Sequence, residues 1–141
     1  MTTVVRKPAF RIWVQGHPQS VQGDRKHLAA YRRRIGEAAR EVVPYPTKSK
    51  RIDLEVYFQS QRALRPDVDN ILKPILDALK GTVYTDDSQV RSITVVALPT
   101  DQAYSLGGWT SIETLKRLLE KPPKEFLIDI YEGMAIYHTP A

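Results

Sequence analysis

Four short segments of alternating apolar and polar residues are separated by helical patterns, and this order constrains the fold more than any other feature. Phe10, Ile12 and Val14 form the first alternation, and segments 52–58, 90–98 and 126–130 supply the others. Period-two alternation is typical of a strand with one buried face. Because the third segment is rich in β-branched residues, we expect it to be buried on both faces toward its end.

Three amphipathic helices are expected between these strands. The first covers about 24–42 with Asp24 as its cap, and the second covers 70–80 before Gly81. The third begins with a capping box of Thr110 and Glu113. The alternation of strands and helices predicts an α/β (α+β) fold, with a small mixed sheet of about four strands packed with about three helices. The pattern leaves strand order and direction open.

The organisation of the chain is simple. At 141 residues, and with no repeat, low-complexity tract or internal boundary, we expect a single domain over residues 1–141. No stretch approaches the roughly 20 apolar residues of a membrane-spanning helix, and the N-terminus has no apolar run of signal-peptide length. We therefore expect a cytoplasmic protein with no membrane partner.

The residue types available for chemistry are restricted. Cysteine is absent, and the only histidines are His17, His27 and His138. Disulfides, thiolate zinc sites and cysteine nucleophiles are therefore excluded. Since no two histidines share a short metal-binding spacing, a zinc site is not expected either. Catalysis would have to use carboxylates, lysines or hydroxyls.

Basic side chains are unevenly distributed. A net charge of +5 and a pI near 9.5 favour a polyanionic partner such as DNA. The candidate phosphate contacts are Arg32, Arg33, Arg34, Lys48, Lys50, Arg51 and Arg65. The alternative is that these residues form an ordinary solvated helix face and loop.

An acidic pair lies just before the second helix. Arg65 precedes Pro66 and is therefore biased to extended backbone, and if the extension continues, Asp67 and Asp69 project from one face. Two adjacent carboxylates repel unless a cation neutralises them, and Mg²⁺ prefers such oxygen ligands. The pair is therefore a candidate half-site for Mg²⁺. The alternative is that either aspartate simply caps the helix.

A second acidic pair, Asp86 and Asp87, follows the same helix. Adjacent side chains of an extended segment point to opposite sides, so one of these two is expected to face the first pair. Lys73 lies one helical turn past Asp69, near the same cluster. The alternative is that Asp86 and Asp87 are ordinary turn residues before a strand. Two acidic pairs around one helix with a nearby lysine favour a metal-dependent phosphodiester chemistry.

These motifs resemble a known family. The run DVDNILKPILDALKG followed by VYTDDSQV resembles the signature of the RusA family of Holliday-junction resolvases, which is common in phages and prophages. The resemblance covers roughly residues 65–91, and the strand and Gly-x-Pro turn at Gly16 and Pro18 also match the layout.

The resemblance implies a site and a mode of action. Asp67, Asp69 and Asp87 match the family's metal-binding catalytic carboxylates, Lys73 matches its catalytic lysine, and Asp86 matches an additional acidic position. It further implies a homodimer in a bacterial or phage-infected cytosol, in which each subunit cuts one strand of a four-way DNA junction during recombination and repair.

The expected mechanism is hydrolysis of a DNA phosphodiester with Mg²⁺, for which Mn²⁺ could substitute. Because nearby carboxylates favour its charged form, Lys73 is expected to stabilise phosphoryl charge rather than act as a general base. Two alternatives stay open: a metal-dependent nuclease on other branched or duplex DNA, and a non-enzymatic phage or prophage DNA-binding protein. Comparing cleavage of different DNA substrates separates the first alternative from junction resolution. Asp69→Asn separates the second, because it should abolish cleavage by a nuclease and leave the function of a DNA-binding protein intact.

Overall fold

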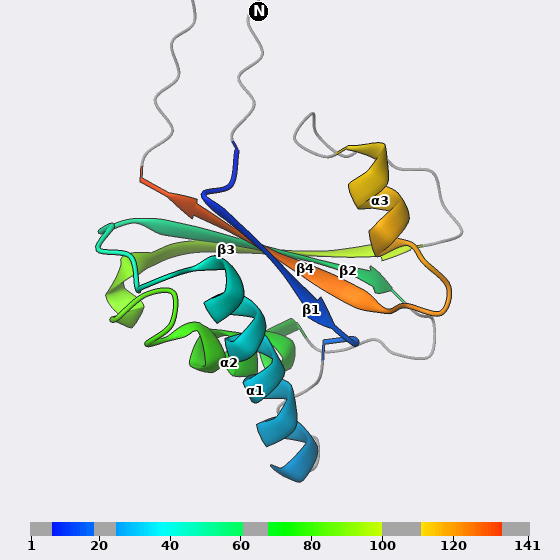
Figure 1. The fold of residues 1–141 in the computed structure, drawn as a ribbon, viewed down its shortest axis with the longest axis horizontal. Helices are drawn as coiled ribbons and strands as arrows, with labels where there is room; N and C mark the ends of the chain where they lie inside the picture. The colour runs from blue at the N-terminus through cyan, green and yellow to red at the C-terminus, as the bar shows by residue number, and fades with distance from the viewer. Residues whose placement is uncertain (1–6, 19–24, 61–67, 100–110, 134–141) are drawn as a thin grey trace, which may run out of the picture.

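The computed structural model describes residues 7–18, 25–60, 68–99 and 111–133. The elements, in chain order, are β1 (Phe10–Gln15), α1 (Arg25–Val42), β2 (Ile52–Ser60), α2 (Val68–Leu79), the 3₁₀ turn η1 (Asp87–Gln89), β3 (Val90–Pro99), α3 (Ile112–Leu118) and β4 (Glu125–Glu132). They form one four-stranded mixed sheet with three α-helices, which confirms the expected α+β fold (Figure 1).

The sheet has the order β1-β4-β2-β3. β4 runs antiparallel to both β1 and β2, with Ile130 opposite Phe10 on one side and Leu54 on the other. β2 and β3 are parallel. A parallel pair needs a crossover, and α2 provides it by leaving the far end of β2 and returning the chain to the start of β3. This return path places the two acidic pairs relative to each other.

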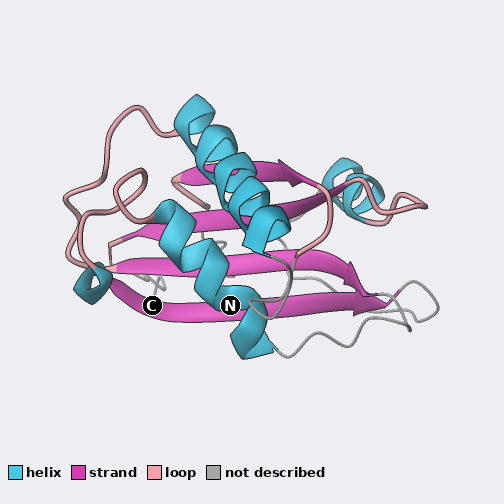
Figure 2. Ribbon diagram, turned by 90° about the horizontal axis from the view of Figure 1, so that it is seen from below, coloured by secondary structure: helices cyan, strands magenta, loops and turns pink. Residues whose placement is uncertain are grey.

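α1 and α2 lie side by side across one face of the sheet (Figure 2). Their apolar residues pack against the facing side chains of β1, β2 and β4 to form the main core, in which Ile12, Val14, Ile35 and Ile71 are fully buried. The alternation predicted for β1 is therefore confirmed. Gly36 of α1 lies buried at the contact between the two helices, where an added Cβ would lie 3.9 Å from the Ala78 carbonyl oxygen of α2 and 3.4 Å from Nη1 of Arg40.

Three local expectations were wrong. β3 is an edge strand, so Ala97 is exposed instead of being buried on both faces. α3 is capped by Ser111, whose side chain accepts a hydrogen bond from the Thr114 amide, rather than by Thr110. α2 begins at Val68, two residues earlier than the apolar stripe indicated. Asp24, the expected cap of α1, lies outside the described residues.

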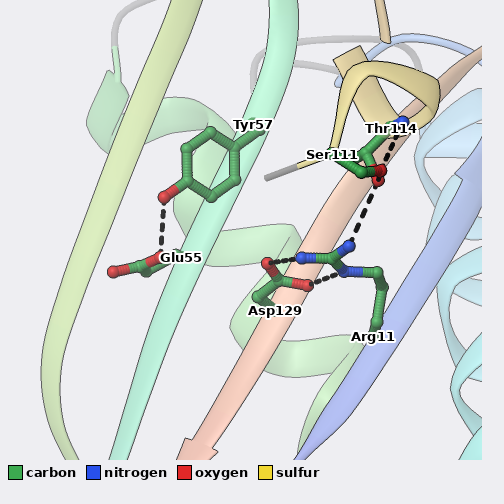
Figure 3. Close-up of polar contacts among 6 residues, drawn as sticks. All are labelled: Arg11, Glu55, Tyr57, Ser111, Thr114 and Asp129. Carbon is green, nitrogen blue, oxygen red and sulfur yellow. Dashed lines mark hydrogen bonds and ion pairs between the residues drawn. The ribbon is translucent and has the colours of Figure 1, made fainter. Parts of the chain in front are cut away.

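α3 lies on the opposite face of the sheet, where its Leu118 packs in a second apolar cluster and Arg11 donates a hydrogen bond to it (Figure 1). Arg11 of β1 donates from Nε and Nη2 to the two carboxylate oxygens of Asp129, at 2.9 and 3.1 Å, and from Nη1 to Thr114 of α3 (Figure 3). Asp129 is fully buried, and burial raises the pKa of its carboxyl while Arg11 opposes that rise. Arg11 therefore joins the edge strand, the neighbouring strand and the helix.

Candidate active site

Asp69, the described member of the first acidic pair, lies at the start of α2. The backbone of Asp69 is in the first helical turn, and Lys73 is exposed one turn later. Residues four apart share a helix face, so Lys73 lies on the same side of α2 as Asp69. Asp67 and Arg65 fall outside the described residues.

The second pair lies in the turn before β3, and its two members differ. Asp86 is the N-cap of η1, and its Oδ1 accepts a hydrogen bond from the Ser88 amide at 3.1 Å. The carboxylate of Asp87 is 72% exposed, with its Oδ2 3.4 Å from Nζ of Lys80. Asp86 therefore stabilises the turn, whereas Asp87 presents oxygen ligands to solvent.

Asp69 and the second acidic pair lie at opposite ends of α2. At a rise of about 1.5 Å per residue, the ten steps from Asp69 to Leu79 span roughly 15 Å. Asp87 lies beyond the second end, because Lys80 directly follows the helix and contacts it. Mg²⁺ binds its ligands at about 2.1 Å, so ligands of one ion must lie within a few ångströms of each other. Within one chain, the structure does not bring Asp69 and Asp87 together.

No group of three histidine or acidic side chains with metal-binding geometry occurs among the described residues. The donors nevertheless fit a hard divalent cation. Asp87 offers an exposed carboxylate, and an adjacent cation, Lys80, holds one of its oxygens by a contact that a metal ion could replace. A magnesium site that includes Asp87 therefore needs ligands from another segment.

The basic candidates fall into two groups. In α1, Arg33 and Arg34 are exposed, while Nη2 of Arg32 lies 3.6 Å from Asp77 of α2. Arg32 therefore also joins the two helices. Cζ of the Arg34 guanidinium lies 6.0 Å from the centroid of the Tyr31 ring.

The second basic group belongs to the loop before β2. Lys48 and Lys50 are exposed, and Nε of Arg51 lies 3.6 Å from the buried Asp53. Thr47 of this loop forms a bridge with Tyr84, which precedes the second acidic pair. The lysines of the loop and Asp87 therefore belong to the same end of the sheet.

Two residues of this region were not expected from the sequence to act at the site. One is Lys80, the partner of Asp87, and the other is Gln89, whose side chain holds the turn. The spacing of Asp86 and Gln89 is that of a capping box, so the sequence contained a signal for Gln89. The contact between Lys80 and Asp87 follows the turn at Gly81, where φ is +86°. No short sequence motif predicts this contact.

A small α+β fold with exposed carboxylates, a lysine beside them and a basic surface is typical of metal-dependent nucleases. A profile of the family described as Endodeoxyribonuclease RusA matches residues 7–105, which is well over half of the chain. The chain therefore belongs to the RusA endodeoxyribonuclease family, as the motifs indicated. No curated protein sequence matches it. Among the described residues, none of the helices has the length and apolar character needed to cross a membrane.

Proposed function

We propose that this protein is a Mg²⁺-dependent endodeoxyribonuclease that resolves four-way DNA junctions by paired phosphodiester hydrolysis in recombination and repair. The observation that carries the proposal is the family match over residues 7–105, within which the whole acidic and lysine set is present. The expected setting is the cytosol of a bacterium or of a phage-infected cell, and Mn²⁺ is expected to replace Mg²⁺ in vitro.

In this proposal Asp67, Asp69 and Asp87 hold the metal. Bound Mg²⁺ supplies a Lewis acid that polarises the scissile phosphate and lowers the pKa of an attacking water. The ammonium of Lys73 neutralises negative charge that builds on the phosphoryl oxygens. Asp86 keeps its capping role and fixes the turn that presents Asp87.

The separation along α2 leads to a specific form of the homodimer. We propose that a two-fold axis places the α2 helices of two subunits antiparallel, so that Asp69 of one subunit lies near Asp87 of the partner subunit. Each dimer then has two shared sites, one for each strand that must be cut. This arrangement supplies additional ligands for Asp87, around which the described part of a single chain forms no group of three metal-binding side chains.

The DNA is expected to be held mainly through its phosphates, which position the substrate without reading sequence. Arg33, Arg34, Lys48 and Lys50 are exposed and suit this role. Arg65 remains a candidate outside the described residues. Arg32 and Arg51 already contact carboxylates, so their contribution to DNA binding is expected to be smaller.

The function is tested with a synthetic four-way junction and linear duplexes of the same sequences, each with Mg²⁺ or with EDTA. We expect paired symmetric cuts in the junction only, and only with Mg²⁺. Asp69→Asn should abolish cutting and retain junction binding. Equal cutting of every substrate would indicate a general nuclease, and binding without cutting under any divalent metal would contradict an enzyme.

The shared site is tested by co-expressing Asp69→Asn and Asp87→Asn subunits with different tags and purifying the mixed dimer. Each variant alone should be inactive. The mixed dimer has one site with both substitutions and one intact site, so nicking of one strand should return. If each site belonged to a single subunit, the mixed dimer would stay inactive, and the proposed arrangement would be wrong.

A further inference from the structure

Gln89, the last residue of η1, has a buried side chain with an unusual number of partners. Its exposed fraction is 9%. Its Oε1 accepts hydrogen bonds from the amides of Thr85 and Asp86 and from the Thr85 hydroxyl, each at 2.9 Å. These three donors all belong to the segment that leads into Asp87. The side-chain oxygen of Gln89 therefore fixes the backbone that leads into the second acidic pair.

The other half of the same amide binds a different segment. Nε2 of Gln89 donates to the carbonyl oxygens of Thr47 and Ser49, at 3.0 and 2.8 Å. These partners determine which way the amide points, because carbonyl oxygens can only accept and the three groups on the other side can donate. A reversed amide would lose the four contacts to backbone groups and keep at most the one to the Thr85 hydroxyl, which can also accept. Both hydrogens of the amide are therefore committed to the loop before β2.

This loop carries two of the exposed candidate DNA contacts. Thr47 and Ser49 turn their carbonyl groups toward Gln89, while the side chains of Lys48 and Lys50 are exposed. The Thr47 amide also donates to the carbonyl oxygen of Val83 at 2.7 Å. The basic loop is therefore attached to the acidic turn by Gln89 and by backbone contacts just before it.

We propose that Gln89 is a positioning residue that joins the basic loop at 47–51 and the Asp87 turn into one unit, so that phosphate binding by Lys48 or Lys50 and metal binding by Asp87 favour each other. This inference rests on the proposed function of Asp87. Whatever orders one segment reduces the freedom of the other through the shared amide, and such coupling is reciprocal. Junction DNA therefore lowers the Mg²⁺ concentration that the site requires.

Two substitutions separate the two halves of the amide. Gln89→Glu keeps oxygens that can accept from Thr85 and Asp86, but it places an oxygen against the carbonyl groups of Thr47 and Ser49. This variant therefore loses the hydrogen bonds to the loop and keeps those to the turn. Gln89→Ala removes both sets of contacts. Tyr57→Phe is the matched control, because it removes a 2.6 Å hydrogen bond to Glu55 from a buried side chain on the opposite face of the sheet (Figure 3).

The experiment measures junction cutting against Mg²⁺ concentration and, separately, amide hydrogen exchange without DNA. For Gln89→Glu we expect a half-maximal Mg²⁺ concentration about 10-fold higher, the size of change that 1.4 kcal/mol of lost coupling produces. Exchange should be faster over 47–51 but not at Thr85 and Asp86. Gln89→Ala should accelerate exchange in both segments, and Tyr57→Phe should match the wild type in both assays.

The outcomes distinguish this inference from the proposed function. Suppose that the wild type cuts junctions, and that Gln89→Glu and Gln89→Ala have the same Mg²⁺ dependence as the wild type. The positioning role of Gln89 would then be wrong, and the nuclease function would stand. Unchanged exchange in both segments would overturn it as well. If the wild type fails to cut and Mg²⁺ does not slow exchange at Thr85 and Asp86, the proposed function and this inference fall together.

Discussion

The ammonium of Lys80 lies 3.4 Å from Oδ2 of Asp87, just past the C-terminal end of α2, whereas Lys73 lies near the middle of that helix. The two lysines are exposed on the same helix or directly after it, yet we expect them to act in opposite ways. Lys80 competes with a metal ion for Asp87, whereas Lys73 is placed to stabilise the reacting phosphate.

This difference gives a matched pair of variants. Lys73→Met should lower kcat for junction cutting by at least about 100-fold, the effect typical of losing one group that stabilises transition-state charge. Lys80→Met should retain cutting and need about two- to three-fold less Mg²⁺, since an exposed ion pair contributes under about 1 kcal/mol. Single-turnover rates across a Mg²⁺ titration measure both. Equal losses in the two variants would contradict the assigned roles.

The contact of Arg11 with Asp129 should contribute strongly to stability. Asp129→Ala leaves the guanidinium without its bidentate partner in a part-buried position, and we expect a loss of about 3 kcal/mol in the free energy of unfolding, measured with urea. Glu125→Ala is the control, because its partner Arg117 is exposed and the loss should stay below about 1 kcal/mol. Similar losses for the two variants would show that burial of the ion pair has no special effect.

Tyr84 should make the fold sensitive to alkaline pH. Burial raises the pKa of its phenol from 10.0 to about 12, with smaller contributions from Asp87 and Asp77. Between these values the unfolded chain loses the proton and the folded chain keeps it, so stability is full below pH 10 and falls as pH rises toward 12. Urea unfolding from pH 9 to 12 measures this fall.

Tyr84→Phe tests the assignment. The variant should show a smaller loss of stability at alkaline pH. At neutral pH its free energy of unfolding should be about 1 kcal/mol lower, because it lacks the Tyr84 hydroxyl that donates to the Leu76 carbonyl oxygen at 2.8 Å. Tyr45→Phe, at a 74% exposed position, should behave like the wild type. An unchanged alkaline fall in Tyr84→Phe would assign the effect to other groups.

The basic loop should be visible in the salt dependence of DNA binding. Each lost phosphate contact lowers the slope of log affinity against log salt by about 0.9, so Lys50→Ala should reduce the slope by roughly 1. Lys116→Ala removes an exposed lysine of α3, on the other face of the sheet, and should leave the slope unchanged. Junction binding in EDTA at several salt concentrations measures both. Equal slopes in all three proteins would remove the loop from the DNA interface.

The class of fold and the family could both be predicted from the sequence. Alternation at Ile12 and Val14 and the apolar stripe of α2 are local patterns, and each appears in the structure where it was expected. The family was visible in the same way, because its signature is a continuous run of residues. The capping box of Asp86 and Gln89 is equally local, although its contact with the distant loop is not.

The arrangement of these parts depends on contacts that the sequence pattern does not reveal. Strand direction depends on which hydrogen-bonding partners meet, and the parallel pairing of β2 with β3 forces α2 to cross the sheet. The sequence already places Asp69 at the start of this helix and Asp87 after it, but only the crossing keeps the chain from folding back, so the two residues stay a helix length apart. The exposure of Ala97 follows from the edge position of β3. Such features depend on contacts between residues far apart in the chain, on which local patterns carry no information.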